Sequence, residues 1–198
     1  RSFCSRSISS NEETFFETDI LPSPNGSNDH DILKKLEEKI HKEKYLGVFI
    51  EPTRQKYMDS IDLDFLNKLR KITSKHNTPL VLNETASKLG TFGQATYASN
   101  LMEESPDAMM SYLCGQAALV HISKKYFIDK PLMLISTWDG DEHSLAHAVQ
   151  EYKDFDKNDS EETRKEFNQY LEKVLNSYDF ECFKHDRGAG NFIGSLPP

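Results

Sequence analysis

Two helix-like segments alternate with two short apolar runs between residues 31 and 84, and this order constrains the fold more than any other feature. Residues 32–40 and 62–76 each place apolar side chains at helical spacing, with charged residues between them. The runs at 45–52 and 79–84 follow these segments and have the composition of buried strands. Helix, strand, helix and strand in this order predict an α/β fold with a mostly parallel sheet and crossover helices.

The helix limits and the remaining strands follow from local signals. Asp31 is the expected N-cap of the first helix, which ends near Lys44. Three further apolar runs, at 108–113, 117–122 and 132–136, predict additional strands of the same sheet.

The last third of the chain predicts two helices and a strand pair. One helix is expected from Asp141 to about Tyr152, and a second begins near Asp159, where Asp159 and Glu162 have the spacing of a capping box. The closing stretch "DFECFKHDRGAGNFIGSLPP" contains two short strand-like runs around a glycine-rich turn. No internal repeat is evident.

Three regions are therefore expected along the chain. Residues 1–30 lack helical or strand periodicity and include "LPSPNGSNDHD", which is dense in turn-forming residues, so they predict an extended arm. Residues 31–152 form the α/β unit, and residues 153–198 form a small unit of a helix and a strand pair.

Composition excludes several classes of protein. Hydrophobic residues make up 37% of the 198 residues, which is more than a largely disordered chain carries. The net charge of -8 argues against direct nucleic-acid binding, because such binding needs a basic surface. The three cysteines are few and far apart, as in proteins of a reducing compartment. No apolar run approaches the roughly 20 residues of a membrane-spanning helix, so we expect a soluble or peripheral protein.

The first ten residues, "RSFCSRSISS", carry Arg1, Arg6 and five serines but no acidic residue. This composition is typical of a mitochondrial transit peptide, and it predicts a mitochondrial location with a remnant of that peptide at the start of the arm. A polar tail without a targeting role is the alternative.

Five phrases in collinear order resemble the class III pyridoxal-phosphate aminotransferases, especially the branch of 4-aminobutyrate and lysine epsilon aminotransferases. They are "GVFIEP", "FLNKLRKITSKHNTPLVLNE", "SPDAMMSYL", "STWDGD" and "DRGAGNFIGSLP". The resemblance spans residues 31–198. It implies part of the fold-type I large domain followed by a fragment of the small α+β domain, and it omits the N-terminal part of the large domain with its phosphate-binding loop.

The resemblance also implies where the reactive residues should stand. Pyridoxal phosphate needs a lysine for its Schiff base and an acid beside the pyridine nitrogen. The acid's position holds Asn83, and the lysine's position holds Leu113. No lysine lies between Glu103 and Ser123. The family's carboxylate-binding arginine is replaced by Ala189, although Arg187 remains. We therefore expect no catalytic residue and no bound cofactor.

Two residues keep the family's identity at their positions. Thr137 stands where the family's threonine contacts a phosphate across the dimer interface, and Glu51 stands in the family's Glu-Pro pair. Ordinary hydrogen bonding at strand ends is the preferred interpretation of both residues, and a vestigial role is the alternative.

Other candidate sites are weaker. His143 and His147 are four residues apart on an expected helix near Asp139, Asp141 and Glu142, which is compatible with a metal site, but Ser144 stands where a zincin motif has its glutamate. An exposed polar helix face is the preferred interpretation, with no metal bound. Cys114 near His121 could form a nucleophile and base, but no third orienting residue is identifiable, so a buried cysteine is preferred.

The sequence thus predicts a noncatalytic, aminotransferase-like accessory subunit of a larger mitochondrial protein assembly, such as a respiratory-chain or ATP synthase complex. Its expected partners are other protein subunits, including a peripheral position on a membrane complex, with no small-molecule substrate. The alternative is the inactive partner chain of a split or heterodimeric pyridoxal-phosphate enzyme, whose active chain would carry the lysine and the acid.

Overall fold

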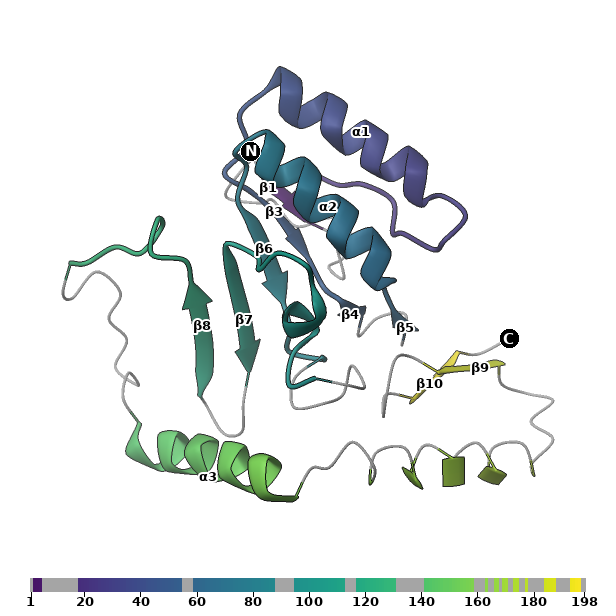
Figure 1. Ribbon diagram of the computed structural model, residues 1–198, viewed down its shortest axis with the longest axis vertical. Coiled ribbons are helices and arrows are strands. Elements are labelled where there is room, and N and C mark those ends of the chain that lie inside the picture. The colour runs from purple at the N-terminus through teal and green to yellow at the C-terminus, as the bar shows by residue number, and fades with distance from the viewer. Residues whose placement is uncertain are drawn as a thin grey trace.

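The computed structural model describes residues 2–4, 18–54, 59–87, 95–112, 117–130, 141–158, 184–187 and 193–196, with isolated positions between 163 and 177. Its centre is a six-stranded sheet with two helices side by side over one face (Figure 1). The third helix lies beyond one end of the last two strands (Figure 1).

The sheet order is β2-β1-β3-β6-β7-β8. In that order the strands are Thr18–Asp19, Ser2–Cys4, Gly47–Ile50, Leu80–Asn83, Ala108–Tyr112 and Ala118–Ile122. Every pair is parallel except β7 with β8, which is antiparallel. The expected mostly parallel α/β sheet is confirmed.

Two amphipathic helices cover one face of this sheet. Helix α1 spans Asp29–Lys42 and helix α2 spans Leu63–Lys75. The strand residues of the main core, in register across the sheet, face these helices. This core includes Leu36, Val48, Ile50, Phe65, Leu66, Leu69, Leu80, Leu82 and Met109. Leu66, Leu80 and Leu82 have no exposed surface, so burial of apolar area holds the two layers together.

Two small antiparallel pairs complete the described strands. Strand β4 (Thr53–Arg54) pairs with β5 (Asp59–Ser60) beside the start of α2. Strand β9 (Lys184–Arg187) pairs with β10 (Ile193–Leu196), which confirms the strand pair expected near the carboxyl terminus. A 3-10 helix, η1, spans Ala98–Leu101 between β6 and β7.

Helix α1 begins earlier than the sequence predicted. Its N-cap is Asn28, so the expected cap, Asp31, lies inside the first turn. The backbone N–H groups of Asn25 and Gly26 donate to the Asp29 carboxylate over 3.1 and 2.9 Å, and Gly26 takes the positive φ of 82° that this turn needs. The preceding turn, and not Asp31, therefore starts the helix.

The expected extended arm also needs correction. Ser2–Cys4 forms β1 inside the sheet, between β2 and β3, with Phe3 opposite Val48. Asp19 follows Thr18 in β2 and accepts a hydrogen bond from the Tyr45 hydroxyl. Its carboxylate also forms an ion pair with Lys39, whose Nζ lies 3.2 Å from Oδ2. The absence of periodicity was misleading because strands of two and three residues are too short to show any.

Helix α3 spans Glu142–Asn158 and so continues past Tyr152, where we expected it to end. The intervening residues "KDFDKN" contain neither proline nor glycine, so nothing local stops the helix. The strand expected at 132–136 lies outside the described residues, and so does most of the helix expected after Asp159. The three-part division of the chain stays a prediction.

Candidate functional site

The carboxyl ends of β3 and β6 bring together two of the residues that the sequence singled out. Because these strands are parallel neighbours, Glu51 and Asn83 emerge at the same edge of the sheet. Asn83 Nδ2 donates to Glu51 Oε1 over 3.1 Å. Asn83 Oδ1 accepts from the backbone N–H of Thr85 at 3.2 Å and from its hydroxyl at 2.7 Å. Both ends of the Asn83 amide are therefore engaged within the chain.

This arrangement does not fit pyridoxal phosphate. The ring nitrogen of that cofactor stays protonated when a carboxylate lies beside it. Asn83 offers a neutral amide at the position that the resemblance assigns to this acid, and its carbonyl oxygen faces Thr85. The Glu51 carboxylate accepts a hydrogen bond from the Asn83 amide instead.

The structure does not place the other residues marked by the resemblance at this edge of the sheet. Leu113, Thr137 and Ala189 lie outside the described residues. Arg187 is the last residue of β9, in the separate two-stranded sheet. Of the three positions where a reactive residue of the family is replaced, Asn83, Leu113 and Ala189, the structure describes only Asn83.

Glu84 is a buried acid whose role the sequence analysis missed. Its side chain has no exposed surface and accepts hydrogen bonds from the backbone N–H groups of Ala98 at 2.6 Å and Ser99 at 2.9 Å. The Ser87 hydroxyl donates a third, at 3.2 Å. Burial raises the pKa of the Glu84 carboxyl, and these hydrogen bonds oppose that shift. The acid directly after an apolar strand was the available signal.

Glu84 therefore acts as an anchor for η1 and not as a catalytic acid. Each carboxylate oxygen accepts from a backbone donor of the first turn of η1, which has no helical acceptor of its own. The segment Tyr97–Leu101 is held against the end of β6 as a result.

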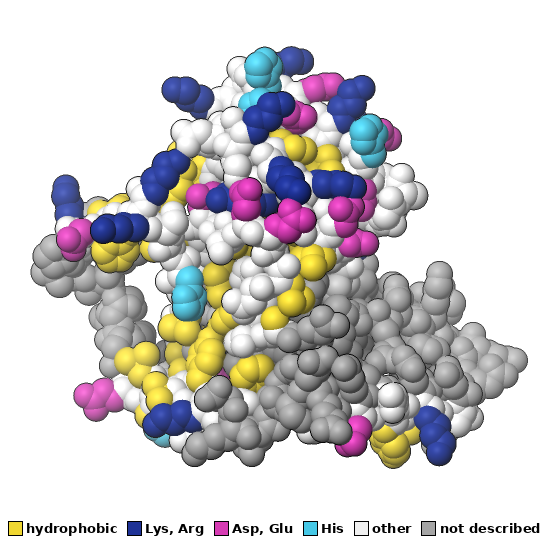
Figure 2. All heavy atoms as spheres, in the orientation of Figure 1, with side chains coloured by type: hydrophobic (Ala, Val, Ile, Leu, Met, Phe, Trp, Pro, Cys, Tyr) yellow, Lys and Arg dark blue, Asp and Glu magenta, His cyan; other side chains and the backbone are white. Residues whose placement is uncertain are grey.

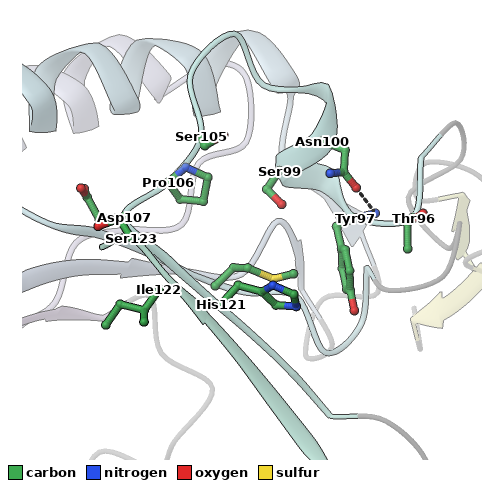
Figure 3. A pocket seen from close by; sticks show the side chains of 11 residues that line it. Thr96, Tyr97, Ser99, Asn100, Ser105, Pro106, Asp107, His121, Ile122 and Ser123 are labelled. Atoms are coloured by element: carbon green, nitrogen blue, oxygen red, sulfur yellow. Dashed lines mark hydrogen bonds between the residues drawn. The ribbon is translucent and has the colours of Figure 1, made fainter. Parts of the chain in front are cut away.

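A groove of about 440 Å³ opens beside this anchored segment (Figure 3). Tyr97 and Asn100 form one wall, Pro106 forms another, and His121 lies opposite. Met109 also lines the groove. The Tyr97 hydroxyl lies 3.3 Å from Ser111 Oγ, and burial raises its pKa. The groove is lined by rings, hydroxyls, an amide, the Asp107 carboxylate and apolar side chains.

The groove carries no nucleophile and base pair among its described residues. The centroids of the Tyr97 and His121 rings are 6.2 Å apart, and no hydroxyl of the described lining hydrogen-bonds to His121. The Asp107 carboxylate is already bound by Arg70 Nη1 at 2.5 Å and by the backbone N–H of Leu80 at 3.0 Å. Cys114, the nucleophile considered with His121, lies outside the described residues.

The two histidine rings on α3 lie close together, but no third described side chain completes a group that could hold a metal ion. The rings of His143 and His147 have centroids 4.5 Å apart in an edge-on arrangement. Asp141 caps the helix, accepting from the N–H groups of His143 and Ser144, and the Ser144 hydroxyl lowers the pKa of its carboxyl. Among the described residues, no three His, Cys, Asp or Glu side chains are grouped to hold a metal ion. Asp139 lies outside them.

Comparison with known proteins shows the fold. No protein-family model matches the sequence, and no curated protein matches it. Among solved structures, ornithine aminotransferase from Plasmodium yoelii is 19% identical with a TM-score of 0.74, over 100% of this chain and 50% of that one. A Bacillus anthracis aminotransferase is 13% identical with a TM-score of 0.76, over 95% and 48%.

The taurine:2-oxoglutarate aminotransferase of Bifidobacterium kashiwanohense is 17% identical with a TM-score of 0.68, over 91% of this chain and 46% of that one. The chain has a partial aminotransferase fold. It spans about half the length of these three aminotransferases. The likeness to the Plasmodium yoelii enzyme includes the first 30 residues of this chain, in agreement with the position of β1 in the sheet.

Within the described part of the chain, no helix has both the length and the apolar character needed to cross a bilayer.

Proposed function

We propose that this chain is a noncatalytic, aminotransferase-like protein of the class III type, in the branch of 4-aminobutyrate and lysine epsilon aminotransferases, and that it serves as a structural subunit of a larger protein assembly. The observation that carries this proposal is the Asn83 amide, which donates to Glu51 and accepts from Thr85 at the position of the family's acid. Leu113 in place of the lysine and Ala189 in place of the arginine support it.

The assembly that we propose is mitochondrial, such as a respiratory-chain or ATP synthase complex. The support is the composition of "RSFCSRSISS", which has arginine and serine without acid. A fluorescent reporter fused to the complete encoded N-terminus should reach mitochondria. A diffuse cytosolic signal would count against this location.

Mass spectrometry of chains that copurify with the native protein tests the assembly. We expect the chain to migrate with a fixed set of other subunits through native electrophoresis, and nucleic acid to be absent from that set because the chain carries a net charge of -8. Migration at the mass of the isolated chain would contradict the proposal.

A second candidate is the inactive chain of a split or heterodimeric pyridoxal-phosphate enzyme. It is favoured by Thr137 and Glu51, which keep the identities that the resemblance assigns to these positions. Here the copurifying chain would itself be aminotransferase-like and would carry both a Schiff-base lysine and a ring acid. Sequencing that chain separates the two candidates.

A further inference from the structure

The turn before α1 contains an Asn-Gly pair, Asn25 and Gly26, which occurs at no other place in the sequence. Both residues are exposed, and the turn leads into the layer of α1 and α2, over which Figure 2 shows charged side chains gathered. Water therefore reaches this part of the backbone. Because Gly26 has no side chain, nothing at that residue shields its backbone nitrogen from the Asn25 side chain.

An asparagine followed by glycine can deamidate by reacting with its own backbone. The Gly26 nitrogen attacks Asn25 Cγ, a C–N bond forms, and the side-chain nitrogen leaves as ammonia, taking up the proton that the Gly26 nitrogen loses. The product is a cyclic imide. Water then opens either carbonyl of the imide, which leaves an aspartate or an isoaspartate at position 25. One water is consumed and one ammonia is released, so no oxidant or reductant takes part.

In the folded chain both reacting groups are held by hydrogen bonds. The Gly26 N–H donates to Asp29 Oδ1 over 2.9 Å. Asn25 Oδ1 accepts from the Ser27 hydroxyl at 2.9 Å and from the Asn28 N–H at 3.1 Å. Removing the Gly26 proton would place an anionic nitrogen beside the Asp29 carboxylate, and like charges disfavour that state. The turn therefore slows the reaction for as long as these hydrogen bonds persist.

Further hydrogen bonds fix the residues on either side of the pair. Asn28 Nδ2 donates to the Ser23 carbonyl over 3.0 Å, and Nη1 of the buried Arg54 donates to the Pro24 carbonyl over 2.6 Å. Gly26 takes a φ of 82° between them. Rotation of the Asn25 side chain toward the Gly26 nitrogen therefore requires a local opening of the turn.

We propose that Asn25 is a deamidation site controlled by this turn, so that it converts to aspartate or isoaspartate when the hydrogen bonds to Asp29 and Asn28 open. An aspartate at position 25 keeps an acceptor for the Asn28 N–H. An isoaspartate lengthens the backbone before Gly26 and moves the Gly26 N–H away from Asp29. Either product adds a negative charge beside Asp29, and the isoaspartate removes the turn that starts α1. This inference is independent of the proposed function.

Timed incubation of the purified full chain at neutral pH tests the site. Peptide mapping by mass spectrometry separates the asparagine, aspartate and isoaspartate forms, and protein isoaspartate methyltransferase labels the isoaspartate. We expect Asn25 to convert at least about tenfold more slowly in the folded chain than in the chain unfolded in urea, because opening the turn breaks several hydrogen bonds. Asn25→Gln should give no product at this position in either state, because its longer side chain closes a larger ring.

Two acids in the first turn of α1 supply matched variants. Asp29→Ala removes the acceptor of the Asn25 and Gly26 N–H groups, and it should speed conversion of Asn25 in the folded chain by about tenfold. Asp29→Asn keeps an acceptor oxygen and should lie between Asp29→Ala and the wild type. Asp31→Ala is the control, since it removes the same charge from an exposed position that accepts none of these hydrogen bonds, and it should leave the rate unchanged.

Three results would overturn the inference. Equal rates at Asn25 in the folded and the urea-unfolded chain would show that the turn does not control the reaction, and this comparison needs no variant to fold. Equal rates in Asp29→Ala and Asp31→Ala, both with the wild-type circular dichroism spectrum, would remove Asp29 from the account. Faster conversion of another asparagine than of Asn25 in urea would show that the Asn-Gly pair is not the reactive site.

Discussion

Asn83 Nδ2 lies 3.1 Å from Glu51 Oε1 and donates its hydrogen to that carboxylate, so that a neutral amide joins the ends of β6 and β3. The orientation of the amide is set from its other end, because Oδ1 accepts from Thr85. A carboxylate at position 83 would face Glu51 as a like charge. The residue that the chemistry of an aminotransferase requires is therefore unfavourable in this structure.

Asn83→Asp should lower the free energy of unfolding by about 1–2 kcal/mol at neutral pH, because it replaces a hydrogen bond to Glu51 with repulsion. Urea denaturation measures the change. Asn67→Asp is the control, since the Asn67 side chain accepts from the Glu103 N–H at the surface, and a carboxylate keeps that role. An unchanged or increased stability of Asn83→Asp would contradict the geometry described for Glu51.

Arg70→Ala should destabilise the fold far more than Lys71→Ala on the same helix. Arg70 and Asp107 are each 15% exposed and pair at 2.5 Å, so the variant leaves a partly buried carboxylate and should cost about 3 kcal/mol. Lys71 pairs with Glu103 in the open, at 59% and 61% exposure, and its loss should have no measurable effect. Equal midpoints for the two variants in urea would refute this ranking.

Glu84→Gln should destabilise the fold by about 2 kcal/mol, because one amide N–H would face a backbone donor of η1. Glu104→Gln, at an acid 53% exposed on its side chain, is the control. Hydrogen exchange of the Ala98 and Ser99 amides gives a local readout, and both should exchange faster in Glu84→Gln. Unchanged protection there would show that Glu84 does not anchor η1.

The Glu84 carboxyl also gives the stability a pH dependence of defined sign. Burial raises its pKa in the folded protein above the unfolded value, so the folded state holds the proton more tightly. The stabilisation from this group is complete below the unfolded pKa and is lost as the pH rises through the folded pKa. The stability of the wild type relative to Glu84→Gln should therefore fall as the pH is raised from about 4. This starting pH is chosen because the pKa of a free glutamate is roughly 4.3. A rise over that interval would contradict the direction of the shift.

Leu113→Lys should not produce transamination. The variant would restore the nucleophile, but Asn83 would still leave the ring nitrogen without an acid, and Ala189 would still leave the substrate carboxylate without its arginine. Transfer of an amino group from ornithine or 4-aminobutyrate to 2-oxoglutarate should remain at the level of the unsubstituted chain. Measurable turnover would show that less of the site has been lost.

The strong apolar periodicity in the sequence predicted the helices and the central strands. The shortest strands show no such periodicity, so the sequence did not predict them. Leu66, Leu69, Leu80 and Leu82 follow helical and strand periods because one side of each element is buried, and the structure confirms α2 and β6 at those positions. Strand β1 has three residues and no period of its own, and its pairing with β3 depends on residues more than 40 positions away. Such pairing is invisible to a local pattern.

The candidate site divides in the same way. The loss of the family's acid at position 83 could be predicted from a motif, because Asn83 stands directly after an apolar run. Its hydrogen bond to Glu51 depends on the parallel pairing of β3 and β6, which joins residues 32 positions apart. The anchoring of η1 by Glu84 likewise depends on how the 95–101 segment folds back, and no spacing in the sequence encodes that contact.

The most direct test of the central claim is incubation of the purified full chain with pyridoxal phosphate, followed by borohydride reduction and peptide mapping by mass spectrometry. Reduction makes any Schiff base permanent, so a functional site appears as one lysine modified in every molecule. We predict only low, scattered labelling of surface lysines, unchanged in Asn83→Leu. Stoichiometric modification of a single lysine, with an absorbance band that borohydride abolishes, would contradict the account of a noncatalytic chain.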